Sequence, residues 1–383
     1  MPARYASLRS AVAAALLFGA GLAAAGPPTY TLTNLGTLGG SASFGAGINE
    51  LGQATGWSSN GQGQEIRAFL WDSGTMRSLG TLPGLGDLDS YGSGINDLGQ
   101  VAGRANVYET GPAAFLYRDG RMVDIGKLGG YPHGSGLGIN NAGQVTGQAE
   151  MARGEPHAFV YTDGVMQDLG TLGGVYSAGL AINASGQVAG YAQVAPRDPR
   201  EPPSEGPIHA FLSDGSVMTD LGTLGGGHSE AHGINDSGEV VGLSSFDIFD
   251  IEHAFLYRDG HMQDLGTISG FPDDSSGATD INNRGDVVGW SSFNDAVHGF
   301  LYSDGAMTDL NDLLSAGQRS EWTVVDTNGI NDAGQIIATA WGSDGWRAVL
   351  LTPTIPEPST AVMLAAGLGV VAWARRRRVG RRR

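Results

Sequence analysis

The stretch between Gly233 and Gly270 contains GINDSGEVVG, a spacer, and then HAFLYRDGHMQDLGTISG. The same unit returns along the chain, and its isoleucine recurs seven times at spacings of 43 to 52 residues. These isoleucines are Ile48, Ile95, Ile139, Ile182, Ile234, Ile281 and Ile330. Such recurrence indicates an array of similar structural units rather than one distinct site.

Each unit divides into four short segments in which apolar and small residues recur with a period of two. In the fifth copy these segments are Glu230–Asn235, Glu239–Ser244, His253–Tyr257 and Met262–Leu265. Turn residues separate them, so the pattern predicts four antiparallel strands, named A to D in chain order. Asp259-Gly260 between C and D, and the Asn-Asp-Ser-Gly sequence between A and B, predict tight hairpins because these residues accept positive φ angles.

The ends of the array predict a closed ring. Four strands in about 47 residues are typical of a β-propeller blade, with a β-helix or open solenoid as the alternative. The seventh copy has strands A to C over Val325–Ile330, Gln335–Ala340 and Arg347–Leu351 but lacks strand D, whereas an extra D-like stretch, Tyr30–Leu35, precedes the first copy. We therefore expect an all-β fold, a seven-bladed propeller over residues 26–354 whose N-terminal strand completes the last blade and leaves no free sheet edge.

The N-terminal residues have the pattern of a secretory signal. Arg4 and Arg9 precede an apolar run over Ala11–Ala24, and the small residues Ala23-Ala24-Ala25 stand before Gly26. This pattern predicts a signal peptide over residues 1–25, cleaved after Ala25. A short transmembrane anchor is the alternative, which the shortness of the run disfavours.

The C-terminal residues 355–383 have a different pattern. Pro356, Glu357 and Pro358 lead into an apolar run over Ala361–Ala374, and seven arginines follow. As a helix this run would span about 21 Å, less than the roughly 30 Å hydrocarbon core, so arginine side chains would have to snorkel. We expect transient insertion into the inner membrane, with the arginines on the cytoplasmic side and the array outside.

The array itself is strongly acidic. The chain has 22 basic and 39 acidic residues; two arginines of the signal, seven arginines of the tail and Glu357 lie outside the array, which leaves 13 basic and 38 acidic residues, a net charge of −25. This charge argues against nucleic acid or an anionic membrane surface as a partner. The chain has no cysteine, so stability has to come from blade stacking rather than from disulfides.

The strand order predicts which face binds ligands. The short A–B and C–D turns share one side of the disc, so the B–C and D–A connections lie on the other side, where length varies most. We expect the binding face there. The candidate ligand-binding residues of these loops are Tyr108, Phe246, Asp247, Phe249, Asp250, Phe271, Asp273 and Asp274. Their acidic residues allow Ca²⁺ binding without EF-hand spacing, with simple solvation as the alternative; no other cofactor is expected.

One cluster departs from the repeat. His228, Glu230 and His232 alternate along an inner strand and would share a face. With Asp280 or Asp326 on neighbouring strands, they could ligate a metal or supply acid–base chemistry, although the strand holds the two histidines far apart. Chance polar lining is the alternative. No serine, histidine and carboxylate set can be assembled, so no catalytic residue is assigned.

Three residue series recur once in most copies. The histidines that begin strand C predict a structural hydrogen bond in each blade, because residues a blade apart cannot share one metal ion. The phenylalanines and methionines predict core packing. The series are His157, His209, His253 and His298; Phe69, Phe115, Phe159, Phe211, Phe255 and Phe300; and Met76, Met122, Met166, Met218, Met262 and Met307.

Two parts of the chain resemble known families. The tail IPEPSTAVMLAAGLGVVAWARRRR resembles the PEP-CTERM sorting signal. That resemblance implies a Gram-negative bacterium that makes extracellular polysaccharide, and a membrane exosortase that removes the tail near Pro356 to Pro358. The array resembles the HAF extracellular repeat family through Ala68-Phe69-Leu70 and the His-Ala-Phe triplets that begin at 157, 209 and 253, whereas copy seven has Arg347-Ala348-Val349. That family implies no catalytic residues.

These observations predict a secreted, non-enzymatic repeat protein that is sorted to the cell envelope or the exopolysaccharide matrix. There it would act as a binding or structural module for carbohydrate or matrix. A propeller enzyme acting on extracellular polysaccharide, such as a lyase or glycosidase, is the alternative. Aromatic side chains gathered in the loops would favour the module, and a carboxylate pair or metal site in the channel would favour the enzyme.

Overall fold

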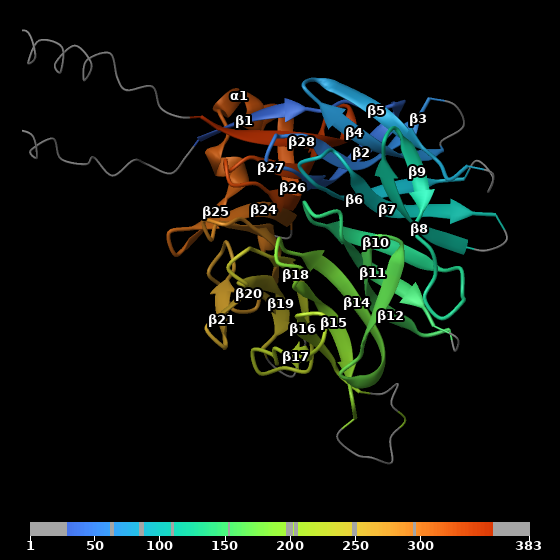
Figure 1. Ribbon diagram of the computed structural model, residues 1–383. Coiled ribbons are helices and arrows are strands. Elements are labelled where there is room, and N and C mark those ends of the chain that lie inside the picture. Colours follow the sequence, from blue (N-terminus) through green and yellow to red (C-terminus); the bar gives the residue numbers. More distant parts are fainter. Residues whose placement is uncertain are drawn as a thin grey trace, which may run out of the picture. The chain divides into compact units, whose positions relative to one another are not determined.

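The computed structural model describes residues 29–61, 65–83, 88–108, 111–151, 154–196, 202, 206–246, 251–293 and 296–354. In these residues, 28 strands form seven four-stranded antiparallel sheets. Figure 1 shows the sheets following one another around a central axis in chain order. The predicted seven-bladed β-propeller is confirmed, and the β-helix alternative is wrong.

Strands A lie innermost and contact one another from blade to blade. From blade 1 to blade 7 they are β2 (Gly39–Ile48), β6 (Ser90–Ile95), β10 (Gly134–Ile139), β14 (Gly173–Ile182), β18 (Ser229–Ile234), β22 (Ser276–Ile281) and β26 (Trp322–Ile330). Strands B are β3 (Ala54–Asn60), β7 (Val101–Val107), β11 (Val145–Glu150), β15 (Val188–Val194), β19 (Val240–Ser245), β23 (Val287–Phe293) and β27 (Ile336–Gly342).

Strands C and D complete each blade. Strands C are β4 (Ile66–Asp72), β8 (Gly111–Arg118), β12 (Pro156–Thr162), β16 (Ile208–Ser213), β20 (Glu252–Arg258), β24 (Ala296–Ser303) and β28 (Gly345–Thr354). Strands D are β5 (Thr75–Gly80), β9 (Arg121–Asp124), β13 (Val165–Gly170), β17 (Met218–Asp220), β21 (His261–Gly266), β25 (Ala306–Asp309) and β1 (Thr29–Asn34). The connection from blade 6 to blade 7 holds the 3₁₀ helix η2 (Leu310–Leu313) and the helix α1 (Ala316–Glu321).

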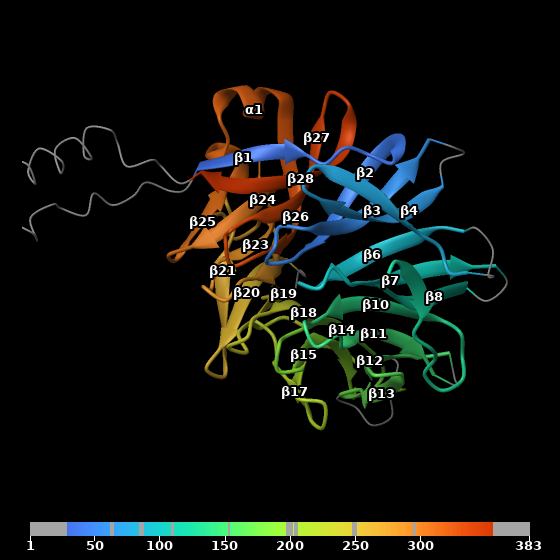
Figure 2. The ribbon, with the colours of Figure 1, turned by 45° about the horizontal axis from the view of Figure 1, so that its top comes forward.

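The N-terminal strand closes the ring as predicted. Strand β1 pairs with β28, so blade 7 has the order β1-β28-β27-β26, and Figure 2 shows β1 lying along β28. Just beyond the strand, Leu35 N donates to Ala348 O at 3.0 Å. The closing strand therefore comes from the opposite end of the chain, which leaves no unpaired edge between the first and last blades.

The local turn chemistry is also as expected. In the C–D hairpin of blade 5, Asp259 has φ 52° and Gly260 has φ 78°, the left-handed values that a tight two-residue turn needs. In the A–B turns, Asn235 accepts a bond from Gly238 N at 3.0 Å through its backbone carbonyl. The predicted strand bounds in blade 5 differ from the observed ones by one residue.

The core lies between successive blades. The recurring phenylalanines of strand C are fully buried. Each pairs with a glycine of strand B, and a Cβ on one of these, Gly56, would lie 3.0 Å from the Phe69 ring. Burial of one such ring contributes about 2–3 kcal/mol relative to exposure. The recurring methionines are buried or packed against the same clusters. Both series are core residues, as predicted.

The two terminal segments lie outside the described residues. The expected signal peptide, its cleavage at Ala25, the sorting motif Pro356-Glu357-Pro358 and the apolar run Ala361–Ala374 all fall there. Within the described ranges, no helix is long and apolar enough to cross a membrane.

Candidate functional site

Each of the recurring histidines hydrogen-bonds to an aspartate inside its own blade. His157, His209, His253 and His298 present Nδ1 to a strand D aspartate eleven residues later, at 2.7 to 3.0 Å. The aspartates are Asp168, Asp220, Asp264 and Asp309. The pairs tie strand C to strand D, so the predicted structural role is confirmed.

The structure describes five of the eight predicted loop residues, and these five come from different blades. Tyr108 in blade 2 is 70% exposed, and Phe271 after blade 5 is 68% exposed. Phe246 instead packs against the imidazole of His253, with ring centroids 4.5 Å apart. Asp273 is exposed. Asp274 accepts a 2.5 Å bond from Ser269 Oγ. Asp247, Phe249 and Asp250 lie outside the described residues.

The cluster of His228, Glu230 and His232 lies at the start of strand β18 and is held together by Glu230. Its Oε1 lies 3.2 Å from His228 Nε2 and its Oε2 lies 3.1 Å from His232 Nε2. Burial raises the pKa of Glu230, but the two histidines outweigh it and lower that pKa to about 2. His232 Nδ1 also lies 3.2 Å from the backbone oxygen of Ala278, so both ring nitrogens of His232 already have partners.

No group of three or more histidine, aspartate or glutamate side chains in the described ranges is arranged to hold a metal ion. Asp326, on the inner strand of blade 7, is near enough for the charge of His232 to act on it. Burial raises the pKa of the Asp326 carboxyl above its ordinary value. The inner wall of blades 5 to 7 is therefore polar and ionisable.

An aromatic row runs over blades 7, 1 and 2. Trp341 and Trp346 face each other across the β27–β28 hairpin, with centroids 5.0 Å apart. Trp346 lies 6.1 Å from Phe44, which stacks on Trp57 at 4.1 Å and 17°. Trp57 in turn meets the edge of Tyr91 at 5.9 Å. Trp341 is 50% exposed, and its hairpin is a B–C connection on the predicted binding face.

Arginines lie at both ends of this aromatic row. The guanidinium of Arg104 lies 4.6 Å from the centroid of the Tyr91 ring. Arg347 Nη1 donates to Ser41 O at 2.7 Å and to Trp346 O at 2.8 Å. The row therefore combines flat apolar faces with cationic donors, although the array as a whole is acidic.

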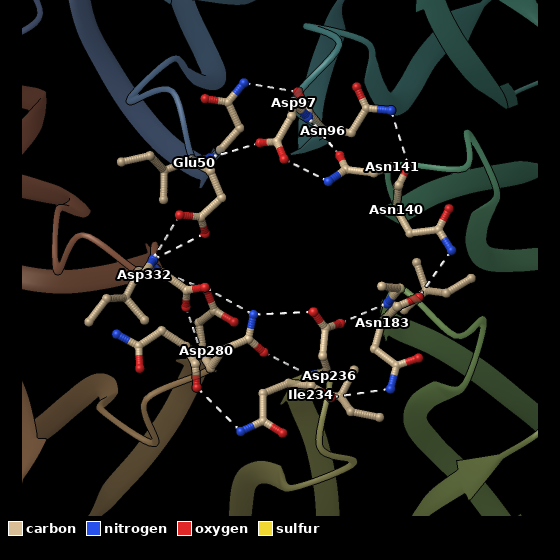
Figure 3. A pocket seen from close by; sticks show the side chains of 18 of the residues that line it. Glu50, Asn96, Asp97, Asn140, Asn141, Asn183, Ile234, Asp236, Asp280 and Asp332 are labelled. Carbon is tan, nitrogen blue, oxygen red and sulfur yellow. Dashed lines mark hydrogen bonds between the residues drawn. The ribbon is translucent and has the colours of Figure 1, made fainter.

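The opposite face of the disc has a ring of asparagines, one from each A–B turn. Each Nδ2 donates to the backbone oxygen of the asparagine in the next blade, at 2.9 to 3.3 Å, and the seventh returns to the first. Figure 3 shows part of this ring. Its members are Asn49, Asn96, Asn140, Asn183, Asn235, Asn282 and Asn331.

This ring surrounds a cavity of about 230 Å³ at the end of the central channel. Carboxylates point into it, as Figure 3 shows for Glu50, Asp97, Asp236 and Asp332. Each accepts a backbone N–H from a neighbouring blade, as Asp97 Oδ1 does from Glu50 N at 2.9 Å. These carboxylates therefore already serve as links between blades.

Asp280 breaks the symmetry of the channel. Every inner strand has a β-bulge near its A–B turn. The residue that directly follows the bulge is Gly or Ala in six blades, and Asp280 in blade 6. Inner strands approach closely there, since a Cβ on Gly47 would lie 3.0 Å from Ser93 O. Burial raises the pKa of Asp280 to about 7, although its Oδ2 accepts a bond from Ile330 N at 2.9 Å.

Sequence reasoning missed both the asparagine ring and the aromatic row. The asparagines were interpreted only as turn residues, although their recurrence before each A–B turn was visible. The signal for the aromatic row was a departure from the repeat: Phe44 and Tyr91 occupy positions where blades 3, 4 and 6 have Ser135, Ala178 and Gly277.

Comparisons with solved structures found propellers of low sequence identity. The chain is similar to a gluconolactonase from Xanthomonas campestris (13% identity, 86% of this chain and 95% of that chain covered, TM-score 0.39). It is also similar to a mutant of AofleA from Arthrobotrys oligospora (11%, 73% and 88%, TM-score 0.40). A third is the PQQ-bound aldose sugar dehydrogenase from Streptomyces coelicolor (14%, 85% and 99%, TM-score 0.39). These similarities leave the function open.

Comparison with curated protein sequences found no match. Residues 227–344 match a family described as "Protein of unknown function (DUF3466)", which spans blades 5 and 6 and much of blade 7. The resemblance to HAF repeats stays a prediction. Residues 354–378 match the PEP-CTERM protein-sorting motif, and this motif implies recognition by an exosortase and a place outside the cell or at its surface.

Proposed function

We propose that this protein is a secreted, non-enzymatic module that binds carbohydrate at the cell surface or in the exopolysaccharide matrix. The observation that carries the proposal is the aromatic row from Trp341 to Tyr91, with an arginine at each end. Flat aromatic faces with a few polar groups beside them are what a sugar-binding surface needs, because the ring faces pack on C–H groups while the polar groups fix orientation.

The exposure of the aromatic row favours ligand binding over packing alone. Phe44 and Trp57 are half-buried, so their stacking stabilises the junction between blades 7, 1 and 2. Trp341 is different, because half of its surface is in solvent and Trp346 holds it edge-on. A large exposed aromatic fixed by a rigid neighbour binds a ligand with little loss of side-chain entropy.

Sorting and binding fit together in this proposal. An exosortase would release the propeller from a transiently inserted tail near Pro356 to Pro358, and the aromatic row would then retain it on extracellular polysaccharide. Tyr108 in blade 2, and Phe271 with Asp273 after blade 5, remain further candidate ligand-binding residues on the same face. Ca²⁺ could act there through Asp273 and Asp274.

The test is binding of the purified full-length protein to a panel of immobilised polysaccharides, with Ca²⁺ and with a chelator, scoring both retention and cleaved products. We expect retention without cleavage. Trp341→Ala should weaken binding by about tenfold or more, as for a central aromatic anchor. Phe271→Ala and Tyr108→Ala are matched controls, since both remove exposed rings from the same face but from other blades.

Three outcomes would overturn the proposal or move its site. Failure to bind any polysaccharide would contradict the carbohydrate function. Loss of binding with Phe271→Ala but not with Trp341→Ala would assign the loop surface in place of the aromatic row. Cleaved product would favour the alternative, an enzyme acting on extracellular polysaccharide.

The enzyme alternative rests on the polar wall of the channel. Against the effect of burial, two histidines lower the pKa of Glu230, whereas burial raises the pKa of Asp326, so the surroundings of these two carboxyl groups shift their pKa values in opposite directions. Such separation is the usual basis for assigning an acid and a base. If cleavage is detected, Glu230→Gln and Asp326→Asn should abolish it while leaving retention on the polysaccharide.

A further inference from the structure

Near the start of strand C, six blades have a basic residue, which is histidine in blades 3 to 6 and arginine in blades 1 and 7. In blades 3 to 6 the histidine binds a strand D aspartate. In blade 1 the equivalent residue is Arg67, whose Nη2 lies 2.7 Å from Glu65 Oε2. The basic residue at this position therefore normally has a carboxylate partner in its own blade.

Blade 7 lacks that carboxylate. Its cation is Arg347, and its strand D is β1, with the sequence TYTLTN and no acidic residue. Among the residues that the structure describes, no carboxylate lies within ion-pair distance of Arg347. Its contacts are the carbonyl oxygens of Ser41 and Trp346, both through Nη1. A guanidinium has five N–H donors, so Arg347 keeps donors for an external acceptor.

Arg347 lies next to the exposed end of the aromatic row. The Arg347 guanidinium and the Trp341 indole both lie near Gly345, which has φ +92°. The Cβ position of Gly345 would lie 3.9 Å from Arg347 Nη1 and 4.0 Å from Trp341 Cζ3. The indole and the guanidinium are therefore within about 8 Å of each other, and the glycine leaves the space between them free of a side chain. An upper limit of about 8 Å leaves room for one sugar ring against the indole with its carboxylate near the guanidinium.

We propose that the ligand is an acidic polysaccharide, with a uronate ring on Trp341 and its carboxylate on Arg347. This inference rests on the proposed carbohydrate function and specifies its ligand class. Arginine suits this task because its planar fork gives two parallel charge-assisted bonds to a carboxylate. Arg104, stacked on Tyr91 at the other end of the row, offers a second cation to the same polymer.

The overall negative charge of the array does not prevent this. At physiological ionic strength, exposed charges are screened beyond about 8 Å. The charge that a bound uronate experiences is then set by its immediate neighbours. These are the exposed carboxylate of Asp344, next to Gly345 in the hairpin, and Arg347, which has no carboxylate partner among the described residues. The negative charge of the array also repels polyanions that do not fit the local cationic aromatic surface.

The experiment compares two forms of one polymer, polygalacturonate and its fully methyl-esterified form, on the full-length protein at fixed salt. We expect tighter binding of the acid form, by about tenfold. Arg347→Gln should remove this preference, so that the acid and the ester bind equally, and Arg347→Lys should restore part of it. Arg121→Gln is the matched control, since it removes one exposed arginine from a C–D turn on the opposite face.

Each result has a defined meaning. If the ester and the acid bind equally in wild type, or if Arg347→Gln keeps the preference, the inference fails while the carbohydrate function stands. Binding of neither form, nor of any neutral polysaccharide, overturns both. Dextran sulfate is the third probe: if it competes as well as polygalacturonate does, Arg347 responds to negative charge in general and the uronate assignment is wrong.

Discussion

The side-chain amide of Asn331 donates to the backbone oxygen of Asn49 at 3.0 Å, across 282 positions of sequence. This bond completes the ring of seven asparagines, just as β1 completes the last blade. The propeller is thus closed twice, at the outer edge by a strand and at the inner end by a side chain. A closed ring without disulfides depends on such contacts, because each joins parts of the chain whose approach costs loop entropy.

Replacement of Asn331 by alanine should therefore destabilise the whole propeller. The change removes the amide donor to Asn49 and the Oδ1 acceptor that holds Gln335 N at 2.9 Å in its own turn. Because both groups are buried, we expect a loss of about 2–3 kcal/mol in the free energy of unfolding. Urea denaturation measures it, with Leu98→Ala in the equivalent turn of blade 2 as an exposed control. Equal midpoints for the two variants would refute a closing role.

The fold could be predicted because its determinants are local and repeated. Asp-Gly turns, Asn-x-x-Gly turns, period-two segments and a recurring isoleucine specify each blade, and the surplus strand at Tyr30–Leu35 shows how the ring closes. The asparagine ring and the aromatic row could not be predicted in this way. Each joins residues of different blades, so both depend on the spatial order of the blades rather than on any single stretch of sequence.

Asp280 should make stability depend on pH. Its pKa rises from 3.8 to about 7 in the folded protein, mainly through burial. A raised pKa means that its stabilising contribution is full below pH 3.8 and is lost as the pH rises through 7. Asp280→Asn keeps an acceptor for Ile330 N and removes the charge. We expect this variant to gain about 1–4 kcal/mol over wild type at pH 8 and little at pH 4, measured by urea denaturation.

Asp280→Gly offers an independent check, because glycine occupies this position in five of the other blades and alanine in one. It should remove the pH dependence in the same way as Asp280→Asn. Between pH 4 and pH 8, the unfolding midpoint of wild type should fall relative to the midpoints of both variants. If it does not, the raised pKa of Asp280 is contradicted.

The His253–Asp264 pair should contribute within a bounded pH range. Burial lowers the pKa of His253, but the hydrogen bond and charge of Asp264 outweigh it and leave that pKa raised. Burial raises the pKa of Asp264, but His253 and Gly266 N leave it lowered. The His253 contribution is full below pH 6.5 and fades above it, and the Asp264 contribution is full above pH 3.8 and fades below it.

Asp264→Asn should thus cost less than about 1 kcal/mol near pH 5, because Asp264 is partly solvated, and still less at pH 9. Thermal unfolding at the two pH values measures the difference. Asp273→Asn, an exposed carboxylate in the following loop, is the control for loss of charge. A cost that grows from pH 5 to pH 9 would contradict the assigned signs.

The candidate site could be predicted only in part, for a physical reason. The proposed surface lies on the face predicted from the sequence, since Trp341 lies on a B–C hairpin, but the aromatic residues predicted there came from the long loops. Phe246 proved to pack against His253. The rings of the aromatic row come from regular strands and a tight hairpin, where cross-strand register rather than loop length decides which side chains meet.

Glu230→Gln should destabilise the inner wall of blade 5 at neutral pH but not in acid. The two histidines lower the Glu230 pKa from 4.5 to about 2 against the effect of burial, so its contribution is full above pH 4.5 and is lost as the pH falls to about 2. The glutamine amide cannot accept charge-assisted bonds from both His228 and His232, so the free energy of unfolding should fall by about 1–2 kcal/mol at pH 6.

Urea denaturation of wild type and Glu230→Gln at pH 6 and at pH 2.5 measures this difference, and His232→Gln should show the same pattern. If Glu230→Gln is as stable as wild type at pH 6, the carboxylate is not held by the histidines and is free to serve the enzyme alternative.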